Sequence, residues 1–263
     1  GKYSTIQAMF AILKEANINC NIYTSPHIKK INERFVFNNE ELNDEDLASL
    51  FEEIETANDN NPITFFEILT AAFFLKAAKY QDNINLIETG LFHRFDATNI
   101  LKNNLASIVT PIGLDHLDWL PENEQTINKI IFEKTSTLLN SKIIVAKQSS
   151  DQIHNKIKEA INKNDSQKYI FYDNYNYSIK ENGFFFYEDE IGCIKLPHPN
   201  VKGQFQLENI STAIATLRAI DELSIGEDHI KNGITKIDSI ARLQEIKSGK
   251  LKDLTKNNLL FID

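Results

Sequence analysis

Apolar positions follow two rhythms along the chain, one typical of helices and one typical of short strands. In residues 4–16 apolar side chains recur every three or four positions, which predicts a helix that Ser4 or Thr5 caps. Further helices are predicted at residues 43–57, 64–79, 122–139, 151–162, 206–221 and 227–236. Short apolar runs predict strands at residues 21–24, 84–87, 107–110, 143–145, 169–171 and 259–263.

This alternation of strands and helices predicts an α/β fold, a doubly wound and mostly parallel sheet. Residues 177–196 break the rhythm, because aromatic and polar residues alternate there around Glu181-Asn182-Gly183. We expect a turn at that tripeptide and a small antiparallel β excursion at about residues 172–200. The last apolar run is predicted to be a buried strand that ends on Asp263. Since a domain rarely stops on such a residue, we expect the chain to be cut there.

Composition narrows the class of protein. Apolar residues make up 42% and charged residues 25% of the 263 positions, enough for a buried core, and only nine are glycine. A net charge of −9 argues against a general nucleic-acid binder. The apolar stretch 63–78 is too short and too charged to span a bilayer, and no signal peptide is visible. Cys20 and Cys193 form no disulfide framework, so we expect a cytoplasmic protein without membrane partners.

Polar residues follow three predicted strands at the point where each strand ends. They are Ser25, Glu88 and the pair Asp115-His116. Ligands of open α/β sheets bind beyond the carboxyl ends of the strands, so these residues could converge on one crevice. Glu88 could ligate Mg²⁺ or be a capping or solvated acid. His116 could be a metal ligand, an acid/base group or a structural histidine.

Two lysines, Lys2 and Lys134, are less clearly indicated as functional residues. Gly1-Lys2-Tyr3-Ser4-Thr5 opens a helix like the second half of a phosphate-binding loop, although an ordinary helix start has the same residues. Glu133-Lys134 lies within a predicted helix, where such a pair is ordinarily solvated on the surface. Periodicity alone does not single out Lys134.

Taken together, the motifs of this chain resemble folylpolyglutamate synthase and its bifunctional form with dihydrofolate synthase, in the ATP-dependent Mur ligase superfamily. In chain order these motifs are Gly1-Lys2-x-Ser4-Thr5, Tyr23-Thr24-Ser25-Pro26-His27, Asn32-Glu33-Arg34, Thr64-Phe65-Phe66-Glu67, Glu88-Thr89-Gly90-Leu91-x-x-Arg94-x-Asp96-Ala97-Thr98-Asn99, Thr110-Pro111-Ile112-Gly113-x-Asp115-His116, Glu133-Lys134, Gly203-Gln204-x-Gln206-x-x-Asn209, Arg242-Leu243-Gln244 and Asp263. The resemblance implies that residues 1–263 form the central ATP-binding domain of that family, of P-loop type. It also implies that the leading phosphate-loop strand and the C-terminal domain are absent.

The resemblance implies a role for each matching position. The nucleotide-binding positions are Gly1, Lys2, Ser4, Thr5, Asn209, Arg242 and Asp263. Ser25 and Glu88 would ligate one Mg²⁺, and Glu88, His116 and Lys134 a second one. Lys134 would be carbamylated, and the catalytic positions would be Lys2, His116 and Lys134. Ser25, Pro26 and His27 would lie where the pterin substrate approaches.

The implied activity is ATP-dependent addition of glutamate to a folate or dihydropteroate carboxylate, by a monomer, through an acyl phosphate. Two alternatives stay open: another Mur-type amino-acid ligase, or a degenerate nucleotide-binding module without catalysis. The second alternative rests on departures from the family pattern. These departures are Tyr3, Phe92-His93, Thr135-Ser136 and Phe205.

Overall fold

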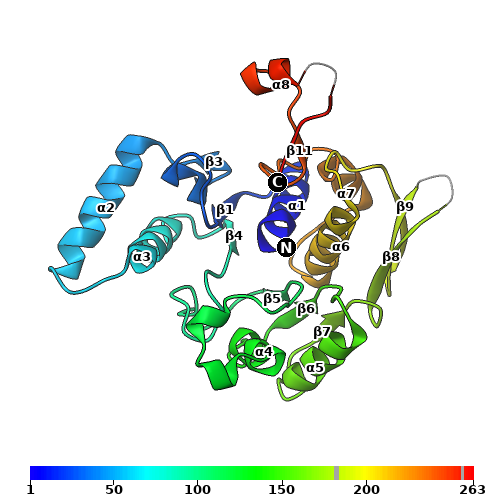
Figure 1. Ribbon diagram of the computed structural model, residues 1–263, viewed down its shortest axis with the longest axis horizontal. Coiled ribbons are helices and arrows are strands. Elements are labelled where there is room, and N and C mark those ends of the chain that lie inside the picture. The colour runs from blue at the N-terminus through cyan, green and yellow to red at the C-terminus, as the bar shows by residue number, and fades with distance from the viewer. Residues whose placement is uncertain (181–183, 256–257) are drawn as a thin grey trace. The chain divides into compact units, whose positions relative to one another are not determined.

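The structure, a computed structural model, describes residues 1–180, 184–255 and 258–263 (Figure 1). Contacts divide the chain into two compact units: Gly1–Ala16 together with Tyr169–Asp263, and Asn17–Lys168. The predicted turn at residues 181–183 lies outside the described residues. In the part of the chain that the structure describes, no helix has both the length and the apolar character that a membrane crossing requires.

The unit Asn17–Lys168 contains a four-stranded sheet in the order β3-β2-β1-β4. Its strands are β1 (Cys20–Tyr23), β2 (Phe35–Phe37), β3 (Glu40–Glu41) and β4 (Ile84–Ile87). Strand β1 pairs in parallel with β4, and Tyr23 lies opposite Ile87, so both strands end at the same edge. The pairings of β2 with β1 and with β3 are antiparallel. The sequence pattern predicted β1 and β4 but not β2 and β3.

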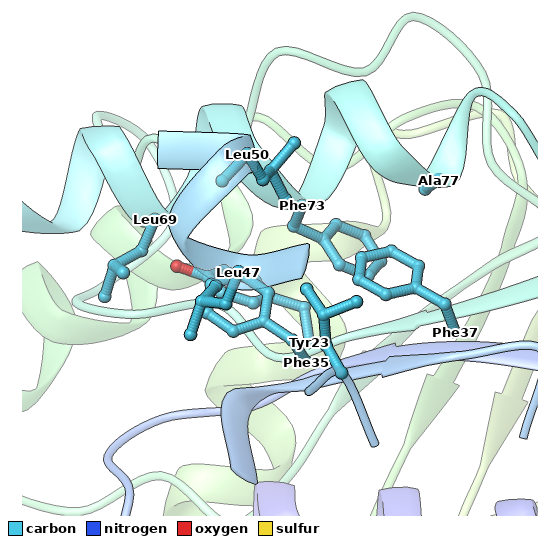
Figure 2. Close-up of a cluster of buried hydrophobic side chains, with 10 residues drawn as sticks. Tyr23, Phe35, Phe37, Leu47, Leu50, Leu69, Phe73 and Ala77 are labelled. Carbon is cyan, nitrogen blue, oxygen red and sulfur yellow. The ribbon is translucent and has the colours of Figure 1, made fainter. Parts of the chain in front are cut away.

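Helices α2 (Asp44–Asn58) and α3 (Phe65–Ala77) build the hydrophobic core of this sheet (Figure 2). The ten buried residues of this core are Tyr23, Phe35, Phe37, Leu42, Leu47, Leu50, Leu69, Ala72, Phe73 and Ala77. The ring of Phe73 stacks on the rings of Tyr23 and Phe37, at centroid distances of 5.2 and 5.5 Å. Thr64 caps α3 and forms a capping box with Glu67. The core therefore fixes β1 and with it the strand end that carries Ser25.

The same unit continues through β5 (Ala106–Val109), α4 (Ile127–Thr135), β6 (Lys142–Val145) and α5 (Asp151–Ile161). Strands β5 and β6 pair in parallel, as predicted. The helix predicted at 122–139 is wrong at both ends. A separate 3₁₀ turn, Glu122–Glu124, precedes α4, and α4 ends at Thr135. Thr126 stops the two from merging: its backbone is extended and its side chain accepts the N–H of Lys129.

In the other unit, helix α1 (Lys2–Glu15) packs on α6 (Gln204–Ala219) and α7 (Glu227–Gly233). A Cβ at Gly233 would lie 2.6 Å from the Cα of Ile12, so α1 and α7 touch backbone to backbone. The prediction that Ser4 or Thr5 caps α1 is wrong. The helix begins at Lys2, and the hydroxyl of Thr5 donates back to the carbonyl of Gly1, 3.1 Å away.

Along the sequence, the boundary between the two units falls within β7 (Lys168–Ile170). The strands that follow β7 belong to the unit that contains α1. The predicted antiparallel excursion is formed by β8 (Tyr175–Ile179), β9 (Phe185–Asp189) and β10 (Gly192–Leu196). The pair β11 (Gln244–Glu245) and β12 (Phe261–Ile262) flanks α8 (Lys250–Leu254). The expected buried strand at 259–263 is therefore two residues long, and it is exposed because it has only this short partner.

Candidate active site

Ser25 and Glu88 meet at the shared edge of β1 and β4. The backbone N–H of Ser25 donates to Oε2 of Glu88 over 3.1 Å, and the N–H of Glu88 donates to the carbonyl of Tyr23 over 2.8 Å. Glu88 is only 5% exposed. The structure thus brings together two of the three predicted strand ends, since parallel pairing carries both chains to one edge.

His116 and Lys134 gather around Asp115. Oδ2 of Asp115 lies 3.7 Å from Nζ of Lys134 and 3.9 Å from Nε2 of His116. The ring of Phe92 lies beside both: it is T-shaped to His116 at 6.2 Å and 5.7 Å from the Lys134 ammonium. His116 has a φ of 55°, in the left-handed region, where the chain turns into the 3₁₀ turn Leu117–Trp119. This cluster links the end of β5 to α4.

Arg94 fastens the segment that follows β4 onto α4. Its guanidinium donates two hydrogen bonds to the Glu133 carboxylate, at 2.7 and 2.8 Å, and its backbone N–H donates to the Glu133 carbonyl. These bonds hold the pKa of Glu133 below its usual range, with a further contribution from Lys129. Glu133, the neighbour of Lys134, is therefore buried rather than solvated, contrary to its interpretation as a surface pair.

Asp96 folds the same segment back on itself. Its carboxylate accepts the N–H groups of Leu91 and Thr98, at 2.9 and 3.0 Å. Gly90 allows this close turn, because a Cβ there would lie 2.5 Å from the Phe66 ring and 2.7 Å from Asp96. The motif from Glu88 to Asn99 is thus held between β4 and α4 by hydrogen bonds of Asp96 and Arg94.

The Ser25-Pro26-His27 segment lies against Arg34. The Nε–H of Arg34 donates to Nδ1 of His27 over 2.9 Å, and the carbonyl of Arg34 accepts the N–H of Thr24. The guanidinium lies over the Phe65 ring, 5.9 Å from its centroid. Burial lowers the pKa of Arg34, although Tyr23 and Glu88 oppose that effect electrostatically.

The predicted nucleotide-binding residues all lie in the unit Gly1–Ala16 with Tyr169–Asp263. At the start of α1, Ser4 and Thr5 are buried while Gly1 and Lys2 are exposed. Such a helix start presents backbone N–H groups and the positive end of the helix dipole to an anion.

Arg242 and Asp263 belong to one local structure in this unit. The Arg242 guanidinium lies 5.8 Å from the Tyr3 ring centroid, at the start of α1. Asp263 accepts the N–H of Leu243, the residue after Arg242, over 3.0 Å. Asn209 is buried on α6 and donates to Oε1 of Gln206 over 3.1 Å.

Among the described residues, no three His, Cys, Asp or Glu side chains gather closely enough to hold a metal ion. The two predicted metal sets are of another kind, because they include the Ser25 hydroxyl and Lys134. Arg34 and Arg94 occur in the sequence motifs without a predicted function, and Asp115 was predicted only to lie beside His116 at a strand end. The sequence pattern does not mark these residues as functional, because a contact with a residue distant in sequence produces no periodicity.

The parallel β1–β4 and β5–β6 pairs, with charged side chains at their carboxyl ends, define an α/β protein of the Mur ligase type. The chain is 30% identical over 236 residues to the dihydrofolate synthase/folylpolyglutamate synthase of Escherichia coli K12, covering 89% of this chain and 53% of the relative. The enzyme of the same name from Buchnera aphidicola subsp. Acyrthosiphon pisum is 27% identical over 253 residues, covering 94% of this chain and 58% of the relative.

Solved structures agree with these relatives. The bifunctional folylpolyglutamate synthase/dihydrofolate synthase of Yersinia pestis, complexed with AMPPNP and a Mn ion, matches with a TM-score of 0.84 at 26% identity, covering 100% of this chain and 59% of that one. An Escherichia coli structure in complex with DHPP and ADP matches with a TM-score of 0.82 at 29% identity, covering 94% and 57%. No family model matches the chain.

The predicted resemblance is therefore confirmed: over most of its length the chain is similar to the folylpolyglutamate synthase/dihydrofolate synthase family. The chain spans little more than half the length of these curated relatives.

Proposed function

We propose that this chain is the ATP-binding part of a ligase that joins glutamate to the carboxylate of folate or dihydropteroate. The observation that carries the proposal is the pairing of Ser25 with Glu88 at one strand edge, in a chain similar over 89% of its length to such a synthase. We also propose that residues 1–263 act as one ATP-binding domain with a β excursion at about 172–200. The protein is proposed to work as a cytoplasmic monomer.

The donor set at the edge of β1 and β4 suits Mg²⁺, a hard cation that prefers oxygen ligands. Ser25 supplies a hydroxyl and Glu88 a carboxylate at the same edge. The Mn ion of the Yersinia pestis structure supports a divalent metal in this family. When bound, such a metal neutralises phosphate charge and withdraws electrons from the γ-phosphorus.

A second metal set consists of Glu88, His116 and Lys134. As an ammonium group, Lys134 pairs with Asp115 and cannot ligate a cation. Its neutral amine would form a carbamate with CO₂: a bond forms between Nζ and carbon, one proton leaves, and the resulting single negative charge is shared by two oxygens. With this modification the donor set fits a metal, and Asp115 is left to orient His116.

The remaining residues hold the two organic substrates. Gly1, Lys2, Ser4 and Thr5 would bind the ATP phosphates at the start of α1. Asn209, Arg242 and Asp263 would hold the adenine, phosphate and ribose. The segment Ser25, Pro26 and His27 would face the pterin substrate.

The reaction begins with two anions that repel each other. A folate carboxylate oxygen attacks the γ-phosphorus, the bond to the ADP oxygen breaks, and an acyl phosphate forms. The amine of glutamate then displaces phosphate from the acyl carbon and loses a proton. In this scheme the Lys2 ammonium stabilises charge on the transferred phosphoryl group.

The test measures ADP release by the protein as its gene encodes it. We expect release only when a pteroate-type substrate and glutamate are both present. Glu88→Gln and His116→Ala should each lower kcat at least about 100-fold, because each removes a ligand near the reacting phosphate. Glu53→Gln, an exposed acid in the middle of α2, should leave kcat unchanged.

Three outcomes would contradict the proposal. ADP release that needs neither substrate would indicate another reaction, and turnover with a cell-wall precursor instead of folate would indicate another Mur-type ligase. An intact protein that binds ATP without any turnover would support a degenerate nucleotide-binding module. The carbamate is tested separately by ¹³C NMR in ¹³C-bicarbonate, where Lys134→Arg should remove the signal.

A further inference from the structure

In the motif Asn32-Glu33-Arg34, the polar side chains of Asn32 and Glu33 are bonded within the local fold, whereas the Arg34 cation has no anionic partner among the described residues. Asn32 donates from Nδ2 to the carbonyl of Leu42 and to the carboxylate of Asp44, at 2.9 and 2.8 Å. Glu33 accepts three backbone N–H groups, from residues 28 to 30, at 2.7 to 3.0 Å. These contacts explain the first two residues of the motif by the local fold.

Arg34 has no such explanation. Arg34 is 8% exposed. Yet in the part of the chain that the structure describes, no carboxylate lies within ion-pair distance of its guanidinium. Its one hydrogen-bonded side-chain partner there is the neutral nitrogen Nδ1 of His27. Glu88 is near enough to act on Arg34 electrostatically but not near enough to form an ion pair.

Arg218 and Arg94 show the usual arrangement for comparison. Arg218 is held by both oxygens of Asp189, at 2.7 and 3.1 Å, and Arg94 by both oxygens of Glu133. Burying a cation without an anion is unfavourable, because the lost hydration is not replaced. Since Arg34 is buried as deeply as a paired arginine but lacks the pair, its environment suits an anion that the chain itself does not supply.

The position of Arg34 indicates which anion it would bind. Its carbonyl accepts the N–H of Thr24, and the next residue, Ser25, donates its N–H to Glu88. The guanidinium also lies over the half-exposed ring of Phe65. The ligand would therefore meet an aromatic ring and a cation beside the strand edge where the proposed phosphoryl transfer takes place.

We propose that Arg34 binds the carboxylate of the pteroate-type substrate before that carboxylate is phosphorylated. This inference rests on the proposed function. The terminal nitrogens Nη1 and Nη2 form a planar fork that matches two carboxylate oxygens, while Nε stays bonded to His27. Arg34 thereby offsets the repulsion between this carboxylate and Glu88, and it fixes the carboxylate in place for attack on ATP.

The test compares two ligands by calorimetry, in the presence of EDTA and without nucleotide, so that no metal can recognise the carboxylate. The ligands are dihydropteroate and the same molecule with its carboxylate replaced by a primary amide. We expect the wild-type protein to bind the carboxylate about 10- to 100-fold more tightly than the amide. Arg34→Met should abolish most of this preference, and Arg34→Lys should keep part of it.

Arg218→Met is the matched control, because it removes an arginine of similar burial from the other unit. It should lower the urea midpoint of unfolding, since it leaves Asp189 buried without its cation. Arg34→Met leaves no buried carboxylate without a cation, so its urea midpoint should stay near that of the wild type. An Arg34→Met midpoint that falls as far as that of Arg218→Met would overturn the inference.

Two further results separate this inference from the proposed function. A wild type that releases ADP with both substrates but binds carboxylate and amide equally would overturn the role of Arg34 alone. An Arg34→Met protein that keeps the full preference would do the same. A wild type that binds neither compound would overturn the proposed substrate class, and this inference with it.

Discussion

Glu133 and Lys134 are neighbours on α4 with different environments. The side chain of Glu133 is 6% exposed and bonded to Arg94, whereas that of Lys134 is 23% exposed and lies near Asp115. Successive residues of a helix point about 100° apart, so each side chain meets a different neighbour. The sequence could not predict this difference, because Arg94 lies 39 positions before Glu133.

Arg94→Met tests how much the contact to Glu133 stabilises the fold. The variant leaves a buried carboxylate without its two strongest hydrogen bonds, so we expect the free energy of unfolding to fall. Urea denaturation measures it. Lys129→Met removes a more distant partner of the same carboxylate, at 3.4 Å, and should lower the free energy of unfolding by less than Arg94→Met does. Equal losses in both variants would contradict this ranking.

The two cysteines should differ in reactivity. Cys20 is fully buried in β1, and burial raises the pKa of its thiol to about 12, while Cys193 is exposed. Because the thiolate is the reactive form, iodoacetamide at pH 8 should label Cys193 alone in the folded protein and both cysteines in urea. Mass spectrometry counts the labels, and Cys193→Ser should abolish native labelling. Labelling of Cys20 at the same rate as Cys193 would contradict the buried position.

The raised pKa of Cys20 also has a consequence for stability. A group whose pKa is higher in the folded state stabilises that state fully below its unfolded pKa, near the ordinary value of 9.0. Above that pH the unfolded chain loses the proton first, so the contribution falls as the pH rises toward about 12. The free energy of unfolding of Cys20→Ala should therefore depend less on pH in this alkaline range than that of the wild type.

At the scale of whole elements, predictions succeeded where a local signal exists. Strand β4 has the predicted bounds. Helix α2 lies within the predicted range 43–57 to within one residue, and it begins after Asn43, whose side chain accepts the N–H of Asp46. The β2–β3 hairpin was missed, because its turn uses Asn38 and Asn39 at positive φ rather than glycine. Its strands are stabilised by pairing with β1 and by the aromatic core, which are contacts distant in sequence.

Gly233→Ala tests the packing of α7 on α1. Helix propensity alone favours alanine over glycine by up to about 1 kcal/mol. The new Cβ would lie 2.6 Å from the Ile12 Cα, so the helices must separate, and we expect a net loss of about 1–3 kcal/mol. Urea denaturation measures the sign of the change. Gly226→Ala is the matched control, because its Cβ would have only a contact at 3.9 Å, to His229.

At the scale of the whole molecule, the proposed site residues divide between the two units. The nucleotide-binding positions lie in Gly1–Ala16 and Tyr169–Asp263, and the metal and pterin positions lie in Asn17–Lys168. The pattern of apolar positions predicted most of the elements but not this grouping. The first helix packs with residues of Tyr169–Asp263 through contacts such as the pair Glu15–Lys236, and nothing local in the sequence encodes such a contact.

The grouping predicts that nucleotide and pterin binding can be weakened separately. Lys2→Met removes an exposed cation at the start of α1, so binding of ADP should weaken about 10-fold or more while binding of dihydropteroate stays unchanged. Arg34→Met should have the opposite pattern, because its guanidinium lies in the other unit. Calorimetry with each ligand alone measures both effects, and Lys247→Met, an exposed lysine, should alter neither. If either variant weakened both ligands equally, the two ligands would depend on a common structure, and the assignment of one ligand to each unit would be wrong.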